Sequence, residues 1–120
     1  MRFHVITLFP EALQSYLATS IIGRAIKEKK IIVKLYNPRD FTHDKWARVD
    51  RRPYGGGPGM VLEAESILKA VKSIRHPMSD VYFFDRSGKE FSNVDARKLA
   101  KSGKDLVFIC GHYEGVDARV

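Results

Sequence analysis

The chain has 120 residues, about the length of one domain, of which 44% are hydrophobic and 29% charged. No apolar run approaches the roughly 18 residues of a membrane span, and the short apolar stretch at the start is interrupted by Arg2 and His4, so neither a membrane span nor a signal peptide is expected. The single cysteine, Cys110, excludes an internal disulfide, which favours a cytoplasmic protein.

The first third of the chain alternates between strand and helix patterns. Phe3 to Leu8 is a β-rich apolar run, and Pro10 suits the first turn of a helix that follows it. A second helix is expected after Thr19 or Ser20, either of which can cap it. Ile31 to Tyr36 then predicts another strand.

The alternation resumes after Arg39 to Gly59, a span without sustained periodicity that is expected to be a functional or mobile loop. Leu62 to Ile74 and Asn93 to Lys101 predict helices. Val81 to Phe84 and Leu106 to Cys110 are short continuous apolar runs, which are typical of parallel strands buried on both faces. With no linker or repeat in the chain, the predicted fold is a single α/β unit with a parallel sheet flanked by helices.

The stretch RRPYGGGPGM, residues 51–60, contains four of the nine glycines and two of the five prolines. Such a composition argues against helix and strand and predicts a shaped loop whose glycines let another molecule approach the backbone. Asp50, Arg51 and Arg52 give the loop a charged rim, which suits an anionic or planar ligand. The alternative is a tight surface turn that binds no ligand. No lysine follows Gly59, which excludes a P-loop, and the preceding segment is too charged for the strand of a dinucleotide site.

Positive charge is concentrated in the first half of the chain. Residues 1–60 carry eleven Lys and Arg against five Asp and Glu, whereas residues 61–120 carry ten against nine. Tyr36, Phe41, Trp46 and Tyr54 are interleaved with these cations. Cations hold phosphates and aromatic faces stack on bases, so the pattern favours RNA binding over the alternative of a solvated basic face.

Two polar segments follow the expected buried strands, and ligands of open parallel sheets bind beyond the carboxyl ends of strands. The two segments are residues 84–88 and residues 111–115. In the second, Gly111 would let a ligand approach the backbone and Glu114 would attract a sulfonium or a metal ion. The alternative for this segment is a plain strand-to-helix turn. Cys110 is expected to be a core residue rather than a nucleophile. The four histidines lack the spacing of a zinc site.

Long motifs in this sequence resemble those of one known family. They are DFTHDKWARVDRRPYGGGPGM from Asp40 to Met60 and CGHYEGVDARV from Cys110 to Val120, supported by RFHVITLFPEAL and IIGRAIKEKKIIVKLYNPRDFT near the amino terminus. The family that these motifs resemble is the bacterial tRNA (guanine-N1)-methyltransferases. The resemblance implies that residues 1–120 form the amino-terminal part of a SPOUT-type methyltransferase domain. The carboxy-terminal knot segment and helical domain of the family are not in this sequence.

The resemblance also implies an activity, which is methyl transfer from S-adenosylmethionine to N1 of the guanine at tRNA position 37, 3′ of the anticodon, by a homodimer. It leaves room for a magnesium ion, and it places the general base beyond Val120, so no catalytic residue is assigned here. The implied cofactor-binding residues are Phe83, Phe84, Gly88, Gly111, Tyr113, Glu114 and Gly115. The implied contacts to the target guanosine are Asp50, Arg52, Tyr54, Gly55, Gly56, Gly57, Pro58 and Gly59.

Two positions depart from the family pattern. Trp46 stands where the family usually has histidine, and Asp85-Arg86 stands where it usually has Ser-Pro. The first changes an expected RNA contact, and the second puts a charge pair beside the expected cofactor wall. A short, catalytically inactive RNA-binding domain is the alternative function, and a nucleotide-binding module without enzymatic activity is a third.

Overall fold

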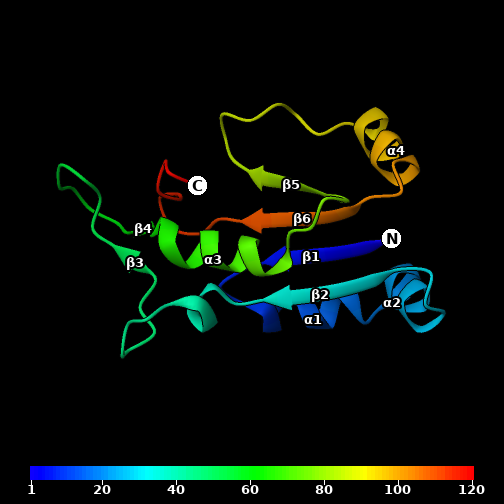
Figure 1. Cartoon of the computed structure of the whole chain (residues 1–120), viewed down its shortest axis with the longest axis horizontal. Helices are drawn as coiled ribbons and strands as arrows, with labels where there is room; N and C mark the ends of the chain where they lie inside the picture. The colour runs from blue at the N-terminus through cyan, green and yellow to red at the C-terminus, as the bar shows by residue number, and fades with distance from the viewer.

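The computed structural model describes all residues 1–120 and contains a four-stranded parallel sheet in the order β2-β1-β6-β5 (Figure 1). The elements in chain order are β1 (Arg2–Ile6), α1 (Pro10–Leu17), α2 (Ser20–Lys27), β2 (Ile32–Tyr36), the 3₁₀ helix η1 (Pro38–Phe41), β3 (Asp50–Arg51), β4 (Val61–Leu62), α3 (Ala64–Ile74), β5 (Ser79–Phe84), α4 (Asn93–Lys101) and β6 (Asp105–Cys110). The predicted fold class is confirmed.

The core lies on one face of the sheet, beneath α3. Ile6 of β1 and Val107 and Ile109 of β6 point to this face and are buried against Ile67 and Ala70 of α3. Parallel strands in the middle of a sheet bury nearly continuous apolar runs, which is why residues 106–110 predicted this strand correctly. Helices α1 and α2 lie on the opposite face, next to β2 (Figure 1). None of the helices is both long and apolar enough to cross a membrane.

Strand β5 differs from the expectation that it is buried on both faces. It is an edge strand that pairs only with β6, and its Val81, Phe83 and Phe84 side chains are 38%, 39% and 53% exposed. Tyr82 and Phe84 reach Phe108 of β6, with ring centroids 6.1 and 5.5 Å apart. The apolar run therefore marked a strand, but its burial was wrongly predicted because no helix covers this edge.

Three local predictions are corrected. The helix expected from Leu62 begins at Ala64, because Val61 and Leu62 pair antiparallel with β3 instead. The irregular span from residue 39 to 59 contains η1 and β3, so the first residue of the RRPYGGGPGM loop, Arg51, is in a strand. Thr19 occupies the N-cap position of α2, yet its hydroxyl donates to the Tyr16 carbonyl at 2.8 Å rather than capping the helix.

A buried carboxylate stabilises the end of the sheet opposite the polar loops. Asp105, 7% exposed, accepts hydrogen bonds from the Arg2 backbone N–H at 3.2 Å and from His76 Nε2–H at 2.9 Å, and it pairs with Arg2 Nε at 2.9 Å. The Met78 N–H donates to the other ring nitrogen of His76, which fits a neutral imidazole with its proton on Nε2. Burial alone would raise the pKa of Asp105, but these partners outweigh it and hold the pKa below its ordinary value.

Replacing this carboxylate is expected to destabilise the fold in a pH-dependent way. Asp105→Asn should lower the free energy of unfolding by about 1–3 kcal/mol at pH 7. The reason is that the donors on Arg2 and His76 lose their charged acceptor. The Asp105 pKa is lower in the folded state, so its stabilisation is present above about pH 4 and is lost as pH falls through the folded value. Urea unfolding at pH 7 and pH 3 should therefore show a difference between the two proteins that shrinks in acid. A smaller effect is expected for Asp80→Asn, because the Asp80 side chain is 32% exposed whereas that of Asp105 is 9% exposed.

Candidate functional site

The polar loops gather at the carboxyl ends of the strands. Figure 1 shows the β3–β4 loop, the turn after β6 and the carboxy terminus at the same end of the sheet, with the β3–β4 loop extending away from the body. This projection fits a Cα radius of gyration of 15.5 Å, larger than the about 14 Å expected for a compact chain of this length. The site is therefore built from segments far apart in the sequence.

Backbone hydrogen bonds join the glycine-rich loop to the turn after β6. The Glu114 N–H donates to the Met60 carbonyl at 3.1 Å, the Leu62 N–H to Gly115 at 3.0 Å and the Asp117 N–H back to Leu62 at 2.9 Å. Leu62 and Val116 form an isolated parallel bridge. This joint, residues 60–62 with 114–117, makes one structural unit of the two motifs.

Glycine is required at position 59 because Glu114 lies directly over it. A Cβ at Gly59 would overlap the Cγ of Glu114 and crowd its carboxylate, and the φ of +93° also disfavours other residues. Gly59 was predicted to contact the target guanosine and Glu114 the cofactor. The structure brings these two residues together, so Glu114 lies at the boundary between the two predicted sets.

A charged pair that the sequence analysis did not single out connects the same two segments. Arg119 makes a bidentate contact with Asp117, with Nε–Oδ1 at 2.9 Å and Nη2–Oδ2 at 2.7 Å, and its Nη2 also donates to the Tyr54 hydroxyl at 3.4 Å. The hydrogen bonds from Arg119 lower the pKa of Asp117 to about 2. Both residues are in the motif CGHYEGVDARV, but an acid and a base two residues apart are too common to indicate a role.

Three of the predicted guanosine contacts, Asp50, Arg52 and Tyr54, line two hollows that share Arg51. Arg52 and Tyr54 border one of about 570 Å³, together with Asp117 and Arg119. Asp50 borders another of about 510 Å³, which also includes Arg48 and Glu63. The tip of the loop is open, because a Cβ at any of its three consecutive glycines, Gly55, Gly56 and Gly57, would meet nothing within 4 Å. Pro58 lies between this tip and Gly59.

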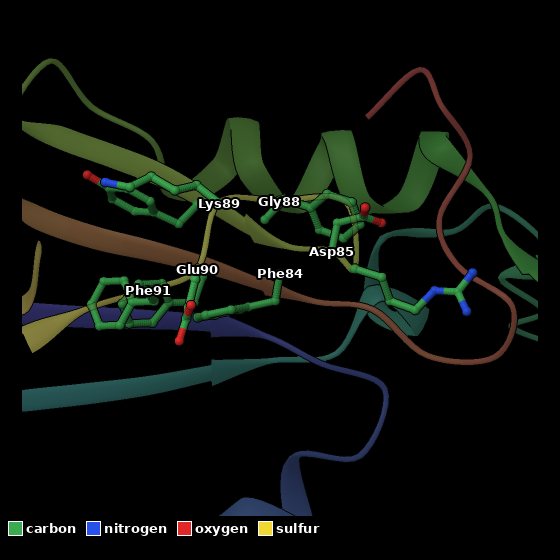
Figure 2. A pocket seen from close by; sticks show the side chains of 10 residues that line it. Phe84, Asp85, Gly88, Lys89, Glu90 and Phe91 are labelled. Carbon is green, nitrogen blue, oxygen red and sulfur yellow. The ribbon is translucent and has the colours of Figure 1, made fainter.

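Part of the predicted cofactor set lines a third hollow, of about 570 Å³, at the end of β5. Phe83, Phe84 and Gly88 border it, and Figure 2 shows Phe84 and Phe91 along one side with Asp85 and Lys89 at opposite ends. Asp85 accepts from the Ser87 N–H at 2.8 Å and from the Ser87 hydroxyl, which lowers the pKa of Asp85. Asp85 therefore stabilises the turn that forms the rim of this hollow.

The rest of the predicted cofactor set lies outside this hollow. A Cβ at Gly111 would lie 3.3 Å from Val116 Cγ2 and 3.5 Å from the Phe83 ring, so this glycine lets the protein's own side chains pack closely. Tyr113 has a φ of +58°, and its ring packs edge-on against His112 at 4.7 Å. Gly115, with a φ of +134°, and Glu114 belong to the joint.

Cysteine and metal chemistry find little support among these residues. Burial raises the pKa of the Cys110 thiol, which suits a packing role rather than a nucleophile. No group of three or more His, Cys, Asp or Glu side chains is arranged to hold a metal ion.

Comparisons with known proteins agree on one family. The family model described as tRNA (Guanine-1)-methyltransferase TrmD matches residues 1–120. The chain belongs to this family. It is 47% identical to the tRNA (guanine-N(1)-)-methyltransferase of Gloeothece citriformis and 44% identical to that of Treponema pallidum, covering all of this chain and 52% and 48% of the relatives. The chain thus spans about half the length of the curated relatives it matches.

A solved structure supports the same membership. The crystal structure of the tRNA (m1G37) methyltransferase from Aquifex aeolicus superposes on all of this chain with a TM-score of 0.84 and 35% sequence identity. The match covers 55% of the Aquifex chain. The fold of this TrmD-family chain is therefore that of a SPOUT-type methyltransferase.

The contact between Gly59 and Glu114 can be tested with a matched glycine. Gly56→Ala should cost about 1 kcal/mol of unfolding free energy, from its positive φ alone, because no atoms are near. Gly59→Ala should cost more, since the methyl group must also displace Glu114. Adding Glu114→Ala to Gly59→Ala should bring the cost back toward that of Gly56→Ala in urea denaturation. Equal costs for the two single variants would show that Glu114 does not constrain Gly59.

The Asp117–Arg119 pair predicts an abnormal titration. Carboxyl-carbon NMR should give Asp117 a midpoint near pH 2, rising toward its ordinary value of about 4 in Arg119→Ala. Asp44 and Asp95, whose pKa values are also lowered to about 2 but by other partners, should not change. If the Asp117 midpoint in Arg119→Ala stays near pH 2, as in the unmodified chain, Arg119 is not its main partner.

Proposed function

We propose that residues 1–120 form the amino-terminal part of a SPOUT-type enzyme that transfers a methyl group from S-adenosylmethionine to N1 of guanine 37 in tRNA. The family match over every residue supports this, and so does the joint between residues 60–62 and 114–117. The proposal includes a homodimer working in the cytoplasm, as the family resemblance implies.

The lining of the hollow at the end of β5 supports the S-adenosylmethionine part of the proposal. Phe84 and Phe91 offer flat apolar faces for an adenine ring, and the carboxylates of Asp85 and Glu90 offer acceptors for ribose hydroxyls. When bound, S-adenosylmethionine supplies an electrophilic methyl group on a positively charged sulfonium. The Glu114 carboxylate, at the joint, would attract that positive charge. Phe83, Gly88, Gly111, Tyr113 and Gly115 complete the proposed cofactor side.

The glycine-rich loop supplies the proposed guanosine side. Arg52 forms no ion pair, so its guanidinium is available for a phosphate or for the guanine O6. Tyr54, 86% exposed and tied to Arg119, can stack on a base. The open glycines 55–57 allow a nucleotide to reach the backbone, and Pro58 limits the freedom of the loop. Asp50 can accept from the guanine N–H groups. Guanine N1 carries a proton at neutral pH, so transfer also needs a base, which the family resemblance places beyond Val120.

The proposal is tested with a chimera of residues 1–120 and the remaining carboxy-terminal half of the Gloeothece citriformis relative. The chimera should form 1-methylguanosine in a tRNA transcript with G37 and none in a transcript with A37, as measured by nucleoside mass spectrometry. Glu114→Gln should lower kcat/KM at least about tenfold, the effect of losing roughly 1.4 kcal/mol of transition-state stabilisation. The carboxy-terminal half alone is the control for background activity.

Two results would contradict the proposal. A folded chimera that binds S-adenosylmethionine by calorimetry but forms no 1-methylguanosine would exclude this reaction. A chimera that binds tRNA but not S-adenosylmethionine would favour the alternative, an RNA-binding domain without catalysis.

A further inference from the structure

The segment from Thr42 to Arg48, which we call the Trp46 loop, has a well-defined shape although it contains no regular structure. The Asp44 carboxylate accepts from the backbone N–H groups of Trp46 at 2.8 Å and Arg48 at 3.2 Å, and it pairs with the Arg48 guanidinium at 2.9 Å. The Thr42 hydroxyl accepts from the Asp44 N–H at 3.1 Å and donates to the Arg48 carbonyl at 3.3 Å. These bonds fix both ends of the loop.

The loop is also attached to the rest of the chain. Arg39 of η1 donates to the Ala47 carbonyl at 3.0 Å. Thr42, Asp44 and Arg48 line the same hollow as Asp50, one of the proposed guanosine contacts. The Trp46 loop therefore borders the proposed substrate side of the molecule.

Trp46 is displayed by this loop rather than packed. Its side chain is 70% exposed, and none of the aromatic ring pairs in the structure includes it. The Lys45 ammonium lies 5.5 Å from its ring centroid. An indole left in water on a loop whose shape is fixed by hydrogen bonds is available for a planar partner without a large cost in chain ordering.

The surroundings of Trp46 favour a nucleobase over a protein surface. Hot spots in protein interfaces lie inside a ring of other contacts in a well-packed patch, whereas the neighbours of Trp46 in the loop are the charged residues Asp44, Lys45 and Arg48. An isolated aromatic ring with a cation beside it, here Lys45, is an arrangement that binds unpaired bases, with the ring on the base and the cation on a phosphate.

We propose that Trp46 is a stacking platform for one unpaired nucleobase of the RNA, with Lys45, which forms no ion pair, placed for an adjoining phosphate, while Arg48 stays paired with Asp44 and holds the loop in shape. The inference rests on the proposed function, because it takes RNA to be the substrate. It assigns base stacking to a residue that lies five residues before the glycine-rich loop.

Trp46 is the only tryptophan in the chain, so its fluorescence reports directly on this contact. The chain is titrated with a labelled RNA hairpin that has the sequence of a tRNA anticodon stem and loop. Label anisotropy measures binding and Trp46 emission measures stacking. We expect the emission to be quenched at the same RNA concentrations at which anisotropy rises. A fully paired RNA duplex of the same length should leave the emission nearly unchanged.

Substitutions give an independent measure. Trp46→Ala should weaken hairpin binding by about 5- to 150-fold, the range for loss of one base–aromatic stack. Trp46→Phe, which keeps a flat ring, should recover most of the affinity. Tyr16→Ala is the matched control, because Tyr16 is also exposed, at 68%, but lies on α1 away from the Trp46 loop. It should bind within about twofold of the unmodified chain.

The results separate the two levels of the proposal. If the hairpin binds by anisotropy while Trp46 emission stays unchanged and Trp46→Ala binds normally, the stacking inference is wrong and RNA binding stands. If the hairpin does not bind, both the inference and the RNA part of the proposed function are overturned. Equal quenching of Trp46 emission by the fully paired duplex would also overturn the inference.

Discussion

The backbone ladder between residues 60–62 and 114–117 is the constraint on which the candidate site depends. Leu62 is fully buried in the core, so the ladder is anchored under α3 and is not a loose surface contact. It holds the base of the glycine-rich loop, positions Glu114 over Gly59 and leads into the turn that carries Arg119. Without it, the loop after β3 and the turn after β6 would be two independent surface segments. The proposed substrate and cofactor sides would then have no fixed relation.

Short-range ion pairs shape the loops that the ladder positions. Asp44 with Arg48 and Asp117 with Arg119 each join an acid to an arginine two to four residues later, and each carboxylate also accepts a backbone N–H inside the same turn. Exposed pairs of this kind contribute little to the stability of the whole protein. Their effect is local, because they select one conformation of a segment that has no ladder of its own. Basic residues near the site are thus held in place while most of their guanidinium surface stays in water.

Periodicity was sufficient to predict the parallel sheet, since residues 106–110 and 3–8 are apolar runs whose burial follows from a central place in the sheet. It failed where the outcome depends on distant partners. Leu62 has the right spacing for a helix, but the backbone at Gly115 and Asp117, more than fifty residues away, holds it in a strand. Val81 and Phe83 were wrongly predicted to be buried, because an apolar run does not show whether its strand lies at the edge of a sheet. The motifs located the site. The pair of Asp117 and Arg119 was not predicted, because its link to the glycine-rich loop, through the contact of Arg119 with Tyr54, is visible only in the structure.

The exposed edge of β5 has a consequence for the behaviour of the isolated chain. A strand that pairs on one side only presents unused N–H and C=O groups, and here they are accompanied by partly exposed Val81, Phe83 and Phe84. Such edges are templates for β-type self-association, which natural proteins oppose with nearby charges. Charged residues of this kind lie at both ends of β5, with Asp80 near its start and Asp85 and Arg86 just after it. The Asp85-Arg86 pair, which departs from the family pattern, thus places two charges at the end of this edge, where they would oppose pairing with a second strand.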